Sequence, residues 1–349
     1  MELRCKRSNK EEIKVAKDTR GTNVWVLAEL EEGKLMNVTF ELLGKAKEMA
    51  AKIEEKVAAV LICSEAGEMP AQLIAAGADI VYTVAGPEYA DYTTDLYTDA
   101  VCQLNDKFAP RALMIAATVD GRDLAPRIAA RLKTGLCADC TEVEMDEEGV
   151  VAWTRPALGG NIYASIVGNE KLPQMGTVRP KVFEAVAADA SRTGEVVPFV
   201  VEGEHVSRVE ILSKTPLSTG NSIKIEDAEV LVSGGRGIGD ASKLAMLEEL
   251  ASLFENSAVS GSRAVVDEGW LPHAKQVGQS GKTVKPKLYF ACGISGAVQH
   301  LAGMKESGCI VAINKDELAP IFSYASFGVV GDLNEILPRL IKKIKDYKA

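Results

Sequence analysis

A glycine-rich turn is the first feature of the sequence that could do chemistry. Residues 234–239 read GGRGIG and follow the apolar run 228–232, and a helix is expected after them. Backbone N–H groups at such a strand-to-helix turn can bind the pyrophosphate of a dinucleotide. The spacing is not a clean GxGxxG, and a plain tight turn would use the same glycines. Arg236 adds a permanent cation, which favours phosphate over a purely structural turn.

Three more segments carry the small and polar residues that typically line a ligand. Residues 261–263 read GSR and are expected to follow a helix and to precede a strand at 264–266, although capping of a loop would use the same residues. The segment QVGQSGK at 276–282 is too polar for a core. The segment GISGAVQH at 293–300 is expected to lead from a strand into a helix. A serine hydrolase is disfavoured because the sequence has no GxSxG elbow.

Polar residues also end two predicted strands and begin one predicted helix. Asn314 and Asp332 each follow an apolar run, and open α/β sheets bind ligands at strand ends. In the DGRD segment at 120–123, we expect Asp120 to cap a helix rather than to bind a ligand.

Cys137 and Cys140 form a single CxxC without a second pair or a nearby histidine, so we expect small buried cysteines rather than a metal site.

These segments need elements to position them, and the apolar pattern predicts an α/β protein. Strands are expected at 24–27, 57–62, 80–84 and 112–115, with helices at 40–53, 70–76 and 94–105 between them. Continuous apolar strands alternating with helices predict a parallel sheet covered on both faces. After a helix near residue 120, antiparallel additions are expected at 141–145, 150–154, 163–167 and 174–178.

A second α/β unit is expected after a linker. Residues 196–221 have little helical periodicity and carry Pro198, Pro216 and Gly220, so they are interpreted as the linker and domain boundary. Strands of a second, smaller parallel sheet are expected at 228–232, 264–266, 287–291, 310–314 and 328–330. The predicted domains are residues 1–210 and 211–349.

Composition excludes several classes of protein. The chain has 349 residues, 47% of them hydrophobic, and a formal net charge of −9, which disfavours a role in coating nucleic acid. No apolar run approaches the ~20 residues that span a bilayer, so no membrane segment is expected. Seven scattered cysteines indicate a reducing compartment, and we expect the cytoplasm.

The order of the motifs resembles a known family. The segments SGGRG, GSRAVVDEG, QVGQSGK, GISGAVQHLAGM, VAINKD and GDL resemble the FAD domain of electron-transferring flavoprotein alpha subunits. Upstream, WVLAE, ATVDGRDLAPRIAARLKTG and TRPALGGN resemble the first domain of that family. The resemblance implies a nucleotide-alpha-hydrolase-like scaffold domain that contacts a beta subunit, followed by a Rossmann-like FAD-binding domain.

The resemblance also implies a set of FAD contacts. Arg263 matches an arginine against the flavin ring, His300 matches a histidine near the C2 carbonyl, and Ser280 offers a hydroxyl to N5 where the family often has threonine. A cation or imidazole there would stabilise the negative charge of the reduced ring. The complete implied set is Arg236, Ser262, Arg263, Val277, Gly278, Gln279, Ser280, Ser295, Gly296, Ala297, Val298, Gln299, His300, Asn314, Asp332 and Leu333.

The implied function is that of a redox carrier rather than a stand-alone enzyme. The family works as an alpha–beta heterodimer whose beta subunit carries AMP or a second FAD. Electrons would pass to or from an acyl-CoA dehydrogenase or similar flavoenzyme, as in fatty acid beta-oxidation. The loops QSGKTVKP and YFACGISGAVQH look like those of anaerobic bacterial members, which favours an electron-bifurcating complex with NADH and ferredoxin.

Two alternatives are of other classes. An NAD-dependent oxidoreductase would need an acidic residue about 20 positions beyond the glycine turn, at the end of the next strand. Glu255 is near that distance but is expected at a helix end. A noncatalytic assembly subunit would use the glycines only for structure and would bind no flavin.

Overall fold

The computed structural model describes residues 21–157, 162–168, 170–203, 207–214 and 223–348. They form two compact units: the first ends at Glu210 and the second begins at Ile211, except that Ala157 and Ile162 group with the second unit. The first unit is built on a seven-stranded sheet whose recorded pairings are all parallel. Across the sheet the strands are β12 (Glu195–Pro198), β5 (Ile80–Ala85), β4 (Val57–Cys63), β1 (Val24–Leu27), β6 (Ala112–Ala116), β11 (Gln174–Val178) and β7 (Leu136–Cys140).

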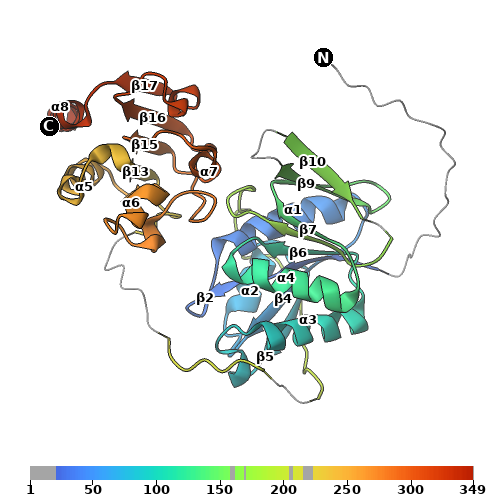
Figure 1. The fold of residues 1–349 in the computed structure, drawn as a ribbon. Coiled ribbons are helices and arrows are strands. Elements are labelled where there is room, and N and C mark those ends of the chain that lie inside the picture. Colours follow the sequence, from blue (N-terminus) through green and yellow to red (C-terminus); the bar gives the residue numbers. More distant parts are fainter. Residues whose placement is uncertain (1–20, 158–161, 169, 204–206, 215–222, 349) are drawn as a thin grey trace, which may run out of the picture. The chain divides into compact units, whose positions relative to one another are not determined.

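Helices cover both faces of this sheet, as the apolar pattern predicts (Figure 1). In β1, Val24 and Val26 pack in one core with α1 (Asn37–Ala51) and α2 (Met69–Ala75). The alternate residues Trp25 and Leu27 pack in a second core with α3 (Thr94–Phe108) and α4 (Val119–Leu132). All four β1 residues are buried, because a central parallel strand has a helix layer on each side.

Two predictions for the first unit are wrong. Residues 174–178 are not an antiparallel addition: all five are buried, and β11 runs parallel between β6 and β7. The expected linker begins at residue 196, but residues 196–198 belong to the edge strand β12 (Glu195–Pro198), which pairs with β5. The pattern predicts a strand at 174–178 but not its direction or its sheet, and it gives no strand at 195–198. Both depend on the partner strands, which lie far away in the sequence.

A separate small sheet contains the other strands expected between residues 141 and 167. Its order is β10 (Ile162–Val167), β9 (Val151–Ala157) and β8 (Glu142–Met145), and the β8–β9 pair is antiparallel as predicted. A short antiparallel hairpin, β2 (Leu30–Glu31) and β3 (Lys34–Leu35), follows β1.

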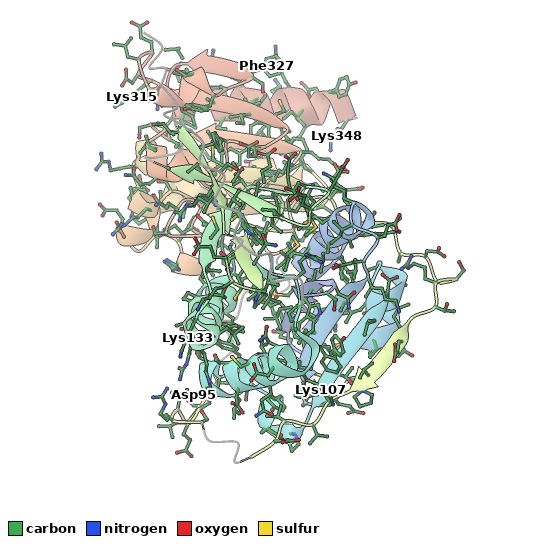
Figure 2. The ribbon with its side chains drawn as sticks, turned by 90° about the vertical axis from the view of Figure 1, so that its right-hand side faces the viewer. Asp95, Lys107, Lys133, Lys315, Phe327 and Lys348 are labelled. Carbon is green, nitrogen blue, oxygen red and sulfur yellow. The ribbon has the colours of Figure 1, made fainter. Side chains whose placement is uncertain are left out.

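The start of α4 differs from the expected capping arrangement. Thr118, not Asp120, is the N-cap residue, and its hydroxyl accepts a hydrogen bond of 3.1 Å from the Gly121 N–H. The helix is tied to α3 by ion pairs from Arg127 to Asp95, which is labelled in Figure 2, and from Arg131 to Asp99 at 2.9 Å. Asp120 lies in the first helical turn, where a carboxylate suits the helix dipole.

The second unit is a five-stranded parallel sheet in the order β14 (Ser257–Gly261), β13 (Val230–Gly234), β15 (Leu288–Cys292), β16 (Cys309–Asn314) and β17 (Phe327–Val330). Its helices are α5 (Leu244–Ser252), α6 (Arg263–Asp267), α7 (Val298–Leu301) and α8 (Leu333–Lys348). The prediction of a strand at 264–266 is wrong: these residues lie in α6, and the strand precedes them. The α/β fold with two parallel-sheet regions is confirmed.

Candidate flavin site

The candidate residues gather at one edge of the second sheet. The loop after each of its strands carries at least one of them: Arg236 after β13, Ser262 after β14, the 295–300 segment after β15, Asn314 at the end of β16 and Asp332 after β17. Because the strands are parallel, their carboxyl ends meet at the same edge. The strand order changes direction at β13, with β14 on one side and β15 on the other, and such switch points are where open α/β sheets bind ligands.

The glycine turn itself serves chain packing more than phosphate binding. The Gly235 and Gly237 N–H groups donate to the carbonyls of Cys292 at 2.8 Å and Gly293 at 3.0 Å. A Cβ atom on Gly235 would lie 2.2 Å from the Gly293 oxygen, so the residue must be glycine for the two segments to meet. What the turn offers a ligand is therefore the exposed side chain of Arg236 rather than this row of N–H groups.

Ser262 and Arg263 lie at the junction of β14 and α6, because residues 264–266 are helical rather than a strand. Both now lie at the carboxyl end of β14, and Ser262 is the N-cap of α6 without a side-chain capping bond. The Arg263 guanidinium is 72% exposed and is 3.3 Å from Asp267 in the next helical turn. An NAD-binding fingerprint needs an acidic residue at the carboxyl end of β14. Glu255 instead lies before β14, at the opposite edge of the sheet, and the residue near its carboxyl end is the cation Arg263.

The 277–280 loop joins the segments that follow β14 and β15. The Val277 N–H donates to the Gly261 carbonyl at 2.9 Å, and the Gln279 N–H donates to the Gln299 carbonyl at 2.7 Å. The loop thus holds exposed Gln279 and Ser280 beside the exposed start of α7. Val277 is itself 1% exposed, so its side chain belongs to the core and only its main chain could meet a ligand.

His300 lies inside the domain rather than on its surface. The ring is 6% exposed; Nδ1 is 3.1 Å from the Val277 carbonyl oxygen, and Nε2 is 3.0 Å from the Tyr289 hydroxyl. A carbonyl can only accept, so we assign the proton to Nδ1 and the Tyr289 hydroxyl as donor to Nε2. Burial lowers the pKa of His300 to about 4, against the opposing effect of the Val277 carbonyl. The imidazole is neutral at pH 7, and it fixes the 277–280 loop to β15.

Other candidates hold the loops in place. The Asn314 side-chain amide donates to the Ile294 carbonyl at 3.0 Å, which joins the ends of β15 and β16. The Asp332 carboxylate accepts from the Asn334 N–H at 2.8 Å at the start of α8, and Leu333 packs into the core. Lys315, labelled in Figure 2, follows β16 at the same edge and was not among the predicted residues.

The donor set at this edge fits an anionic dinucleotide. The Arg236 and Arg263 side chains are exposed, and neighbouring loops carry the exposed hydroxyl and amide side chains of Ser280, Ser295 and Gln299. Guanidinium groups match phosphate oxygens, and hydroxyl and amide groups can donate to ring and ribose oxygens. The arrangement can bind a pyrophosphate-linked cofactor and place a positive charge near its ring.

The predicted site residues did not include Tyr289, which is hydrogen-bonded to His300, or Glu29, whose carboxyl pKa is raised. Tyr289 is the internal partner of His300, and its apolar strand context gives no sign of this contact. Glu29 follows β1 in the first unit, where burial raises its carboxyl pKa to about 7 and its Oε1 accepts a hydrogen bond from Thr118. An acid directly after an apolar strand was the signal in the sequence that could have pointed to Glu29.

Among the described residues, no group of three or more His, Cys, Asp or Glu could hold a metal ion, and Cys137 and Cys140 are both buried.

Taken with the fold, this edge defines a two-domain α/β protein that binds a dinucleotide cofactor in its second domain. Residues 24–202 match the electron transfer flavoprotein domain, and residues 224–305 match the electron transfer flavoprotein FAD-binding domain. The chain belongs to the electron transfer flavoprotein alpha-subunit family, and its cofactor is FAD.

Relatives support this assignment along almost the whole chain. An electron transfer flavoprotein subunit alpha of Thermoanaerobacterium thermosaccharolyticum is 49% identical over 327 residues, which cover 93% of this chain and 98% of the relative. The acryloyl-CoA reductase electron transfer subunit beta of Anaerotignum propionicum is 40% identical over 354 residues, covering 93% and 96%. The LctC subunit of the lactate dehydrogenase (NAD(+),ferredoxin) of Acetobacterium woodii is 42% identical over 339 residues, which cover 96% of this chain and 80% of the relative.

In the part of the chain that the structure describes, no helix is both long and apolar enough to span a membrane.

Proposed function

We propose that this chain carries electrons between redox partners, with its FAD held at the carboxyl edge of the second sheet by the residues described above. The observation that carries the proposal is the convergence of exposed cationic and hydrogen-bonding side chains on the loops after all five parallel strands. No nucleophile–base pair is needed for such a role, because the bound FAD itself accepts and releases electrons.

We expect some residues of this edge to contact the FAD and others to position the loops that carry those contacts. The exposed guanidinium of Arg236 would pair with the pyrophosphate, and that of Arg263 would lie near the flavin ring, where a positive charge favours reduction. His300 would act as a positioning residue: its bonds to Val277 and Tyr289 fix the loop that presents Gln279 and Ser280. Asn314 would similarly fix the loop after β15.

Partners follow from the family and from the names of the relatives. Electron transfer flavoprotein alpha subunits pair with a beta subunit, and we propose that the first unit contacts a beta subunit carrying AMP or a second FAD. The electron donor or acceptor would be an acyl-CoA dehydrogenase or similar flavoenzyme. Relatives named for acryloyl-CoA reductase and for an NAD(+),ferredoxin-dependent lactate dehydrogenase favour a bifurcating complex that also uses NADH and ferredoxin. We place this complex in the cytoplasm.

The test is a visible absorption spectrum of the chain purified with its beta subunit, followed by stepwise reduction. Arg263→Ala should lower the potential of the first one-electron reduction of the flavin by about 60 mV, since a cation near the ring contributes on the order of 1.4 kcal/mol. Arg339→Ala removes an equally exposed guanidinium from α8 and is the matched control, expected to leave the potential unchanged. A protein that stays colourless after FAD and its partner are supplied would exclude the electron-carrier function. Equal potentials in the Arg263→Ala and Arg339→Ala variants would show that Arg263 does not lie near the flavin ring.

A further inference from the structure

The first unit contains a pocket that the flavin site does not use. It lies at the carboxyl ends of β1, β4 and β6 and is lined in part by Leu27, Ile62 and Ala116 from these strands. The space within it is about 40 Å³, and its mouth is open to solvent. The chain leaves β1 through α1 to β4 on one side, while β6 pairs with β1 on the other. The pocket therefore lies at the switch point of this sheet, the place where open α/β sheets bind small molecules.

The walls of the pocket are apolar and aromatic. Leu30 and Leu124 contribute aliphatic surface, and Tyr92 and Tyr97 contribute two rings whose centroids are 5.1 Å apart at an interplanar angle of 71°. The Tyr92 hydroxyl donates to the Asp123 carboxylate at 2.7 Å. Since this hydroxyl is engaged within the protein, the ring is the part of Tyr92 that a ligand would meet.

The ionisable groups of the pocket are of one sign. Glu29 and Asp120 line it, and none of the described residues that line it is lysine, arginine or histidine. A phosphate or carboxylate ligand would meet two carboxyl groups without a cation to pair with, which disfavours anions. A positively charged group would instead form a charge-assisted hydrogen bond with Glu29 and lie near the tyrosine rings, which attract cations.

We propose that this pocket binds the cationic head of a small primary amine or amidine whose apolar body lies at the open mouth beside the tyrosine rings, and that the Glu29 carboxylate is its counter-ion. Thr118 positions the acid because its hydroxyl donates a hydrogen bond to Glu29 Oε1, and the main-chain N–H of Glu29 donates a hydrogen bond to the Thr39 hydroxyl at 3.0 Å. All of its lining residues belong to the first unit, whereas the residues of the flavin edge belong to the second.

Binding should depend on pH in a defined direction. Burial raises the pKa of Glu29 to about 7; Thr118 opposes this effect, and the carboxylates of Asp120 and Glu31 add to it. Burial also raises the pKa values of Tyr92 and Tyr97, so neither ring ionises near neutral pH. A cation requires ionised Glu29, so its affinity should fall about tenfold from pH 8 to pH 6, with proton release at the lower pH.

The experiment is calorimetric titration of the full-length chain, purified with its beta subunit, with benzamidine and with benzoate as the anionic control. Benzamidine should bind saturably and benzoate should not. Glu29→Gln should weaken benzamidine binding by about tenfold or more, because a hydrogen bond between charged groups is lost. Glu65→Gln removes an exposed carboxylate from the segment after β4, outside the pocket lining, and should leave the affinity unchanged.

Three outcomes would overturn the proposal: no saturable heat with benzamidine, equal binding by the wild-type and Glu29→Gln proteins, or equal binding of benzoate. Circular dichroism establishes that Glu29→Gln is folded. If that variant does not fold, the wild-type protein still decides the question. Affinity that does not fall between pH 8 and pH 6, or heat at pH 6 that is independent of the ionisation enthalpy of the buffer, would exclude Glu29 as the counter-ion.

Discussion

Replacing His300 by asparagine should remove an acid sensitivity from the second unit. Burial holds the pKa of His300 at about 4 in the folded protein, whereas an unfolded histidine has a pKa of about 6.5. Below pH 6.5 the unfolded chain therefore binds a proton that the folded chain does not, and stability falls until the pH reaches about 4. Between pH 7 and pH 5 this one residue should cost the fold about 2 kcal/mol.

The variant also has a cost that does not depend on pH. Asparagine can place an amide donor near the Val277 carbonyl, but it cannot reach the Tyr289 hydroxyl as the imidazole does. Leaving that buried hydroxyl without an acceptor should cost about 1–3 kcal/mol at pH 7. The wild-type protein should thus be more stable at pH 7, and the difference should shrink toward pH 5.

The assay is urea-induced unfolding at pH 7 and pH 5, followed by pulse proteolysis with peptide-level mass spectrometry so that the second unit is read separately. His273→Asn changes an exposed histidine in the same unit and should keep the wild-type pH dependence. The reasoning is refuted if wild type and His300→Asn lose the same stability between the two pH values, within about 0.5 kcal/mol.

Further predictions concern the first unit. Gly121→Ala should destabilise it by about 3 kcal/mol, because the new Cβ would lie 1.9 Å from the Ala116 carbonyl oxygen and would displace the capped turn. Gly135→Ala, with nothing within 4 Å of its Cβ, should change its melting temperature little in the same thermal scan. Glu29→Gln should stabilise the protein at pH 8.5 by about 1–3 kcal/mol, because burial raises the pKa of Glu29 to about 7 and its ionisation disfavours folding. This gain should vanish at pH 4; a gain that is the same at both pH values in urea titrations would contradict the assignment.

The sequence predicted most of the parallel framework but not all of its members. The strands at β1, β4, β5 and β6 are continuous apolar runs, and such runs are buried on both faces whatever their partners. In contrast, β11 has the mixed sequence QMGTV, and Gly176 within it lies against the Trp153 ring, which would be 2.1 Å from a Cβ there. Its place is set by a residue 23 positions earlier, which no local pattern contains.

For the candidate site too, the sequence predicted some features, while others depended on contacts between residues far apart in the chain. Motif order alone led to the family and to FAD, and strand-then-turn spacing placed Arg236 and Asn314 at strand ends. The error at 264–266 arose because RAVVD is apolar and β-branched enough to suggest a strand, while the preceding segment SAVSG is small and weakly apolar. Pairing with β13 makes the latter a strand and moves Ser262 and Arg263 to the carboxyl edge.

By itself, the sequence determined the two parallel α/β regions, the acidic character of the chain and the loops that could meet a dinucleotide, because these depend on periodicity and local residue type. Only the tertiary structure decided what those residues contact. It buried His300 against Tyr289, used Gly235 to pack two segments together and placed the half-buried Glu29 where its carboxyl pKa is raised. Burial and long-range hydrogen bonds arise from residues far apart in the chain, so their effects on pKa and packing appear only once the sheets have formed.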